Sequence, residues 1–139
     1  MKKAIIIGAS SGIGKGISIE LLKKNYKIAI TARRKDKLEE IKILYPDNVI
    51  VYPFDSSNEK NDEMLQYLTK KLGGLDLLIY SSGIGIVNKD LEYGIEKKVN
   101  NLNVNGFTQV IGWGFNYFKN QGYGQISNIS SVASEIGNG

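Results

Sequence analysis

Lys3-Ala4-Ile5-Ile6-Ile7-Gly8-Ala9-Ser10-Ser11-Gly12-Ile13-Gly14 is the stretch that decides the fold of this chain. Its apolar run is typical of a buried strand and leads directly into a glycine-rich turn that opens a helix. Backbone N–H groups at a helix N-terminus carry partial positive charge, and glycine lets a phosphate approach them where a Cβ would collide. We therefore expect a cradle for the pyrophosphate of a dinucleotide. The expected cradle residues are Gly8, Ser10, Ser11, Gly12, Ile13 and Gly14.

Two other motifs match the same residues only in part. The pattern Gly8-x-Ser10-x-Gly12 fits the nucleophile elbow of hydrolases, but that elbow follows several strands and its triad needs a histidine. Here a single expected strand precedes the turn, and the chain has no histidine. A Walker A loop would need glycine at Ala9 and a hydroxyl residue at Gly16. Both alternatives are therefore disfavoured.

The composition is that of one soluble globular domain, with 139 residues, 42% hydrophobic and 23% charged. The absence of cysteine and histidine from the sequence excludes disulfides, the usual zinc sites and histidine acid–base chemistry. The apolar run after Lys2 and Lys3 is too short for a signal peptide or a membrane span, so we expect no membrane association and a cytoplasmic location. Scattered lysine pairs account for the net charge of +4, which favours a solvated surface over a nucleic-acid partner.

Strand-like runs alternate with helical periodicity along the chain. The runs expected as strands are residues 4–7, 28–31, 49–52, 75–80 and 125–129. Their near-continuous apolar character predicts a parallel sheet that is buried on both faces. The alternation predicts an α/β fold of the Rossmann type, a doubly wound parallel sheet with strand order 3-2-1-4-5 and a ligand at the carboxyl ends of strands 1 and 4.

Apolar stripes at helical spacing predict which helix faces are buried. The expected core-facing residues are Ile13, Ile17 and Leu21 in the first helix, Leu38, Ile41 and Leu44 in the second, and Met64 or Leu65, Leu68 and Leu72 in the third. Ser56 and Glu59 predict a capping box for the third helix. Residues 92–120 predict one broken helix or two in series, in which Gly106, Gly112 and Gly114 indicate close approach to another backbone.

Several motifs, taken in order, resemble those of the short-chain dehydrogenase/reductase family, and the resemblance covers essentially the whole chain. The turn has the family's Gly-x-x-x-Gly-x-Gly spacing, and Asp55 follows the third strand. Three further motifs are Tyr80-Ser81-Ser82-Gly83, Asn103-Val104-Asn105-Gly106 and Ile129-Ser130-Ser131-Val132. The first of these departs from the usual Asn-Asn-Ala-Gly, so bracing between neighbouring strands must come from hydroxyl groups or other residues.

The resemblance implies a nicotinamide-dependent oxidoreductase that acts on a small carbonyl or alcohol substrate. By the same resemblance Asp55 contacts the adenine ring, and Ser81, Ser82 and Gly83 lie beside the cofactor. Ser131 would polarise the substrate carbonyl, and Asn103 would support a water relay.

The residues after the second strand favour NADP over NAD. Enzymes that prefer NAD place an acid there to bond the ribose 2′-OH, whereas this chain has Ala32 followed by Arg33. Arg33 can clamp a 2′-phosphate with two hydrogen bonds, and Arg34 and Lys35 add positive charge.

The family's catalytic Tyr-x-x-x-Lys would follow Ser131 beyond Gly139. Tyr67 to Lys71 and Tyr93 to Lys97 also match that pattern, but both precede the serine and are interpreted as coincidental. We therefore expect residues 1–139 to be a dinucleotide-binding domain that is incomplete at its C-terminus and inactive alone. The exposed edge of the fifth strand and the uncovered apolar helix faces predict that the chain self-associates or is unstable, and we expect a homo-oligomer. The alternative is a non-catalytic nucleotide-binding module that is complete as it stands.

Overall fold

A computed structural model describes residues 1–9, 12–56, 59–81 and 101–129, with the side chains of the last range described from residue 104 onward. Strands and helices alternate through most of these residues. The elements are β1 (Lys3–Ile7), α1 (Gly12–Lys23), β2 (Lys27–Ala32), α2 (Lys35–Leu44), β3 (Val49–Pro53), α3 (Asn61–Leu72), β4 (Leu77–Tyr80), the π-helix η1 (Asn101–Gly106), α5 (Phe107–Gln121) and β5 (Gln125–Asn128). Each expected strand is present, with ends shifted by two residues or fewer.

The described strands form a parallel sheet in the order β3-β2-β1-β4-β5, which confirms the predicted topology. β1 is central, and its last residue, Ile7, lies in register with Thr31 of β2 and Tyr80 of β4. The carboxyl ends of these strands therefore meet at one edge of the sheet, where doubly wound folds bind their ligands.

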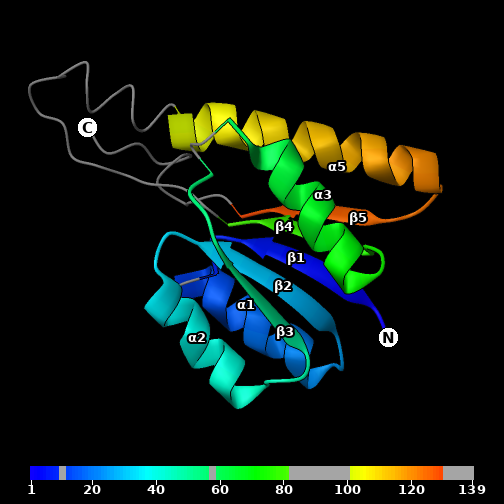
Figure 1. The fold of residues 1–139 in the computed structure, drawn as a ribbon. Helices are drawn as coiled ribbons and strands as arrows, with labels where there is room; N and C mark the ends of the chain where they lie inside the picture. The colour runs from blue at the N-terminus through cyan, green and yellow to red at the C-terminus, as the bar shows by residue number, and fades with distance from the viewer. Residues whose placement is uncertain (10–11, 57–58, 82–100, 130–139) are drawn as a thin grey trace, which may run out of the picture.

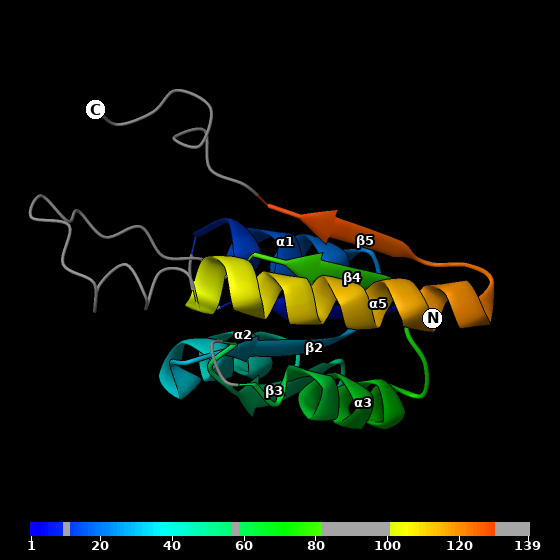
Figure 2. The ribbon, with the colours of Figure 1, turned by 90° about the horizontal axis from the view of Figure 1, so that it is seen from above.

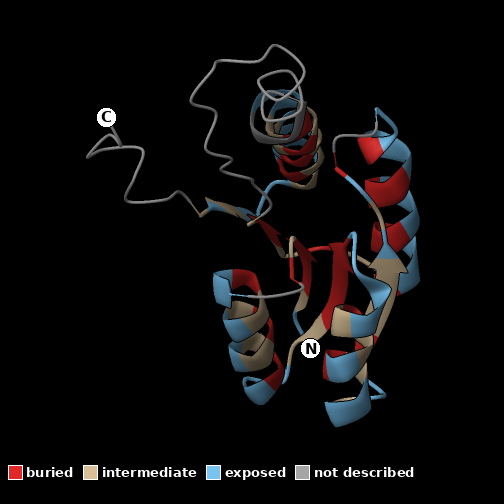
Figure 3. Ribbon diagram, turned by 90° about the vertical axis from the view of Figure 1, so that its left-hand side faces the viewer, coloured by how far each residue is buried: buried red, intermediate tan, exposed pale blue. Residues whose placement is uncertain are grey.

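Helices cover both faces of the sheet (Figure 1). α1 and α2 lie on one face, while α3 and α5 lie on the other, with α5 running beside β4 and β5 (Figure 2). Figure 3 shows buried strands between helices whose outer surfaces are exposed. β5 at the edge is less covered than the central strands, since it has no fully buried residue. No helix among the described residues is long and apolar enough to span a membrane.

Alternation along β1 divides the core into two layers. Ile5 and Ile7 pack with α3 and α5, whereas Ala4 and Ile6 pack with α1 and α2. The strand is apolar at successive positions because both of its faces are buried. This pattern explains why the central strands could be recognised from the sequence alone.

The predicted face of the first helix is confirmed in part, since Ile17 and Leu21 are partly buried and pack against the core, whereas Ile13 does not. The buried residues of α1 are Gly14, Ser18 and Leu22. Ile13 is 61% exposed, because the helix turns its glycine and serine toward the sheet. Small residues on this face let the helix axis lie close to the strands, and the hydroxyl of Ser18 donates to the Gly14 carbonyl at 2.8 Å.

Two expectations for α2 and α3 are also corrected. Leu44, the last residue of α2, is exposed rather than buried. The capping box predicted at Ser56 and Glu59 is absent, since α3 begins at Asn61 and its N-cap residue, Lys60, makes no side-chain capping bond. Instead, the side-chain amide of Asn61 donates back to the Ser56 carbonyl at 2.9 Å.

The glycines around α5 differ in how closely they approach other atoms. A Cβ at Gly106 would lie 2.6 Å from the Ser56 carbonyl oxygen, and one at Gly114 would lie 2.5 Å from Cδ2 of Leu78. A Cβ at Gly112 would meet no atom within 4 Å. Close approach to another backbone is therefore confirmed for Gly106. Gly114 approaches side chains of β4 and β5 instead, and the expectation is wrong for Gly112.

We expect Gly106→Ala to lower the free energy of unfolding by about 1–3 kcal/mol, because the added methyl group would press against the Ser56 carbonyl. Gly112→Ala is the matched control. Its methyl group enters open space, and alanine in a helix interior is favoured over glycine by about 0.5–1 kcal/mol. Urea unfolding of both variants measures the difference. Equal stability changes would contradict the packing assigned to Gly106.

Candidate functional site

The glycine turn lies between the ends of β1 and β2. After β1 ends at Ile7, Gly8 adopts a left-handed φ of 89°, and its N–H donates to the Thr31 carbonyl at 2.7 Å. Gly12 at the start of α1 also has a positive φ, of 61°. These conformations favour glycine, so the turn requires the residues that the sequence places there.

Gly14 brings the first turn of α1 against this loop. A Cβ at Gly14 would collide with the Gly8 carbonyl oxygen and would lie 3.1 Å from Oγ of Ser81. The first turn of α1 carries no acidic side chain, which leaves the positive end of the helix open to an anion. A close-packed glycine turn at a helix N-terminus fits the pyrophosphate of a dinucleotide.

Residues that follow four strands lie at the edge of the sheet that carries the turn. The N–H of Ser81, after β4, donates to the Ile7 carbonyl at 2.7 Å. The N–H of Phe54, after β3, donates to the Ala32 carbonyl at 2.9 Å, so Asp55 follows β3 next to the point where Arg33 follows β2. The structure therefore brings these residues to the same edge of the sheet, where they follow one another in the order Asp55, Arg33, Gly8 and Ser81.

The end of β2 presents basic side chains without an acid at its last position. Ala32 is buried there, and both Arg33 and Arg34 are exposed. Arg34 donates to the Asp36 carboxylate at 3.0 Å, and no ion pair engages Arg33 within the described residues. Desolvation raises the pKa of Asp36, but the hydrogen bond and charge of Arg34, together with hydrogen bonds from backbone N–H groups, outweigh it, and the pKa is lowered. Arg33 is thus the guanidinium open to a phosphate.

Tyr80 occupies the position where the family motif has its first asparagine. Its ring is buried and meets Phe107 of α5 edge-on, with ring centroids 5.7 Å apart. Its hydroxyl oxygen would lie 3.0 Å from a Cβ at Gly106. Tyr80 therefore fills the space between β4 and the start of α5, and the expected bracing between neighbouring strands stays a prediction.

Some predicted site residues lie outside the residues that the structure describes. These are Ser10, Ser11, Ser82, Gly83 and Ser131. Asn103 lies in η1, of which the backbone is described at that position. A π-helical turn is rare and is often found at functional sites. Ile13, by contrast, is described and lies exposed in the first turn of α1, beside the glycine turn.

The Tyr-x-x-x-Lys match at Tyr67 and Lys71 has a structural explanation. Both residues lie on α3, and the Lys71 ammonium lies 5.7 Å from the centroid of the Tyr67 ring. Tyr67 also packs on Tyr52 of β3 at 5.4 Å between centroids. The pair is a cation–π contact on the α3 surface. Tyr93 and Lys97 lie outside the described residues.

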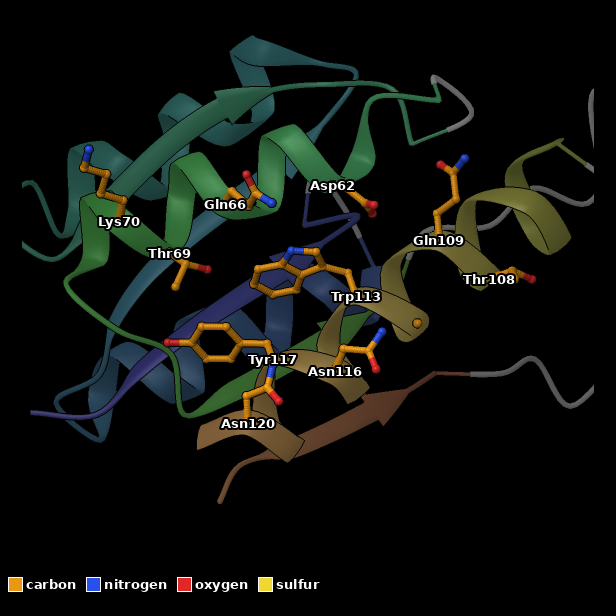
Figure 4. Close-up of a pocket in the computed structure, with 11 residues that line it drawn as sticks. Asp62, Gln66, Thr69, Lys70, Thr108, Gln109, Trp113, Asn116, Tyr117 and Asn120 are labelled. Carbon is orange, nitrogen blue, oxygen red and sulfur yellow. The ribbon is translucent and has the colours of Figure 1, made fainter. Parts of the chain in front are cut away.

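A cavity of about 630 Å³ lies between α3 and α5 (Figure 4). Trp113 and Tyr117 stack along it, with ring centroids 5.1 Å apart and planes 12° from parallel. Burial and, secondarily, the nearby Tyr123 and Asp76 raise the pKa of Tyr117. No described residue of the glycine turn lines this cavity, so it is separate from the candidate cofactor site.

Sequence reasoning missed two residues at the start of α3 and α5. Asn61 is fully buried, and its amide donates to Oε1 of Gln109 at 2.6 Å. Asparagine is typical of helix starts, which is the one local signal that could have drawn attention to Asn61. Nothing in the sequence pairs it with a residue of α5.

Comparison with known proteins finds relatives whose sequence similarity extends over most of this chain. An uncharacterized oxidoreductase of Staphylococcus aureus strain N315 is 31% identical over 136 residues, which cover 95% of this chain and 59% of the relative. This chain therefore spans about three fifths of the length of that curated relative.

Solved structures share the fold. ElxO with NADP bound is 28% identical with a TM-score of 0.87, covering 99% of this chain and 58% of that one. A 7α-hydroxysteroid dehydrogenase in complex with NADH and 7-oxo glycochenodeoxycholic acid is 25% identical with a TM-score of 0.90, covering 99% and 56%.

The family comparison agrees with the glycine turn, the strand order and the order of the motifs. The model of the short chain dehydrogenases matches residues 2–139, nearly the whole sequence. On this evidence the chain belongs to the short-chain dehydrogenase family.

Proposed function

We propose that this chain is the cofactor-binding part of an NADP-dependent oxidoreductase that interconverts a ketone and an alcohol. One observation carries the proposal. The glycine turn packs so closely on α1 that a Cβ at Gly14 would strike Gly8, and Arg33, which forms no ion pair with a described residue, follows β2 at the same edge of the sheet. A pyrophosphate cradle and a guanidinium for a further phosphate are what NADP requires.

Each candidate residue has a role in this proposal. Gly8, Gly12 and Gly14 let the pyrophosphate approach the backbone, together with Ser10 and Ser11. Ile13 would cover one side of the cofactor with its exposed side chain. The remaining roles rest on family resemblance, with Asp55 at the adenine ring and Ser81, Ser82 and Gly83 along the cofactor.

The preference for NADP rests on charge at the end of β2. Ala32 offers no carboxylate for a ribose 2′-OH, and Arg33 is exposed beside it. Arg34 contributes positive charge while it is paired with Asp36. ElxO has NADP bound, whereas the 7α-hydroxysteroid dehydrogenase has NADH, so family membership alone does not choose the cofactor.

The catalytic proposal concerns Ser131 and Asn103. A bound nicotinamide would supply or accept a hydride. The Ser131 hydroxyl would donate a hydrogen bond to the substrate carbonyl oxygen, where negative charge develops. Asn103, in the π-helical segment that precedes α5, would hold a water for proton transfer.

Titration of the 139-residue chain with NADP, NAD and adenosine 2′,5′-bisphosphate tests the proposal. We expect NADP and the bisphosphate to bind and NAD to bind at least about tenfold more weakly than NADP, since a hydrogen bond to a charged group contributes about 1.5–3 kcal/mol. Isothermal titration calorimetry measures all three affinities. A chain that is folded by circular dichroism and binds none of them would contradict the proposal.

Homo-oligomerisation and a cytoplasmic location stay predictions of the sequence. The structure adds that Val104 and Phe115 are exposed, at 53% and 62%, on η1 and α5. Exposed apolar side chains near an edge strand favour association. Analytical ultracentrifugation is expected to show a species larger than the monomer, and a monomer at all concentrations would contradict it.

A further inference from the structure

Asn61 is a buried polar residue that connects two segments far apart in the sequence. Its exposed fraction is 0%, and it is the first residue of α3. Its side-chain nitrogen donates to the Ser56 carbonyl at 2.9 Å and to Oε1 of Gln109 at 2.6 Å. Both hydrogens of the amide group are therefore used, one toward each segment.

The two acceptors lie in segments that each adjoin a part of the candidate site. Ser56 adjoins Asp55, in the loop that leaves the carboxyl end of β3. Gln109 lies in the first turn of α5, three residues after Gly106 ends η1. Figure 4 shows Gln109 on α5 across from Asp62, the neighbour of Asn61, at the start of α3.

Close packing reinforces this connection. Gly106 lies against the Ser56 carbonyl, where a Cβ would be 2.6 Å from the oxygen. The same carbonyl accepts the Asn61 amide, so η1, the β3–α3 loop and the start of α5 meet around one peptide group. A displacement of the loop would have to move η1 or break a buried hydrogen bond, which is costly in a water-excluded position.

We propose that Asn61 is a positioning residue that fixes the loop after β3 to the start of α5, so that binding of the adenosine half of the cofactor also orders η1. This inference rests on the proposed function, because it takes Asp55 to be at the adenine and Asn103 to be in the catalytic segment. Coupling between two sites is reciprocal. A substitution that loosens the start of α5 is therefore expected to weaken adenosine binding. Gln109 is suited to this test because it lies in α5 and not after β2 or β3, where the residues proposed to bind the adenosine lie.

The experiment removes the acceptor on α5. Gln109→Met keeps the length of the side chain and deletes the oxygen that accepts from Asn61. Gln109→Glu keeps an acceptor oxygen and serves as the rescue. Asn116→Met is the control, since Asn116 is exposed on the same helix and has no hydrogen bond to a described residue.

Adenosine 2′,5′-bisphosphate is titrated into the full 139-residue chain and each variant. We expect Gln109→Met to weaken its affinity by about fivefold or more, the lower end of typical coupling between sites. Gln109→Glu and Asn116→Met are expected to bind within about twofold of the original chain, since neither loses the link. Equal affinities for Gln109→Met and Asn116→Met would overturn the proposal.

Hydrogen exchange without nucleotide separates this inference from the proposed function. We expect Gln109→Met to speed amide exchange at residues 54–56 and 104–106 together, and Gln109→Glu to restore it. Acceleration confined to α5 would overturn the connection, even in a chain that binds nucleotide. If the original chain does not bind the bisphosphate, the proposed function falls, and exchange alone decides whether Asn61 holds the two segments together.

Discussion

Gly14→Val is expected to weaken dinucleotide binding by this chain severely. Even the Cβ of valine would collide with the Gly8 carbonyl oxygen, and it would lie 3.1 Å from Oγ of Ser81. Overpacking of this kind costs about 1–3 kcal/mol, and here the cost falls on the loop that must hold the pyrophosphate. The expected loss of NADP affinity is about 100-fold, near the upper end of that range, because the obstacle is backbone.

Gly16→Val is the matched control for this prediction. It adds the same side chain two residues later on α1, where a Cβ meets no atom within 4 Å. Calorimetric titration with NADP should leave the control near the original affinity, while circular dichroism verifies that both variants are folded. Undiminished binding by folded Gly14→Val would show that the pyrophosphate is held elsewhere.

The fold could be predicted from the sequence because its central strands are apolar at successive positions. Ile5, Ile6 and Ile7 fill cores on both sides of the sheet, and no surface helix gives that pattern. The end of α3 has a similar local cause, since Gly73 stops the helix in a left-handed conformation that favours glycine. Strand order then followed from the handedness of parallel connections.

Helix faces were harder to predict, because apolar residues are not always the ones that face the core. In α1 the face against the sheet is formed by Gly14 and Ser18, whose small size sets the helix close to the strands, while Ile13 is exposed. If the proposed cofactor binds, that exposure has a functional reason. The apolar stripe at helical spacing treats every isoleucine as buried, so it misplaces an isoleucine that is exposed for binding a ligand.

The candidate site could be predicted where it depends on backbone and strand ends. Gly8, Arg33, Asp55 and Ser81 follow four neighbouring strands, so topology alone brings them together. The link from Asn61 to Gln109 could not be predicted, because it depends on side chains that are 48 residues apart. The sequence could also not predict that Arg34, and not Arg33, forms the ion pair with Asp36, because that pair depends on side-chain conformation.

Arg33→Asp is expected to reverse the cofactor preference. The substitution removes the guanidinium that is open to a 2′-phosphate, and it places a carboxylate next to Ala32, where a ribose 2′-OH would be bonded. A hydrogen bond to a charged group contributes about 1.5–3 kcal/mol, so the ratio of NADP to NAD affinity should fall by about 10- to 150-fold. Titrations with both dinucleotides under the same salt conditions measure that ratio.

Arg34→Asp decides which arginine holds the phosphate. It makes the same change of charge one residue later, and Arg34 already donates to Asp36 at 3.0 Å. General attraction between a basic surface and a phosphate would lower the ratio equally in both variants, and added salt would screen it. A specific clamp at Arg33 would make the Arg33→Asp effect at least about tenfold larger, since a bidentate pair depends on geometry as well as charge. Equal effects would leave NADP preference as a property of the basic segment after β2 rather than of one side chain.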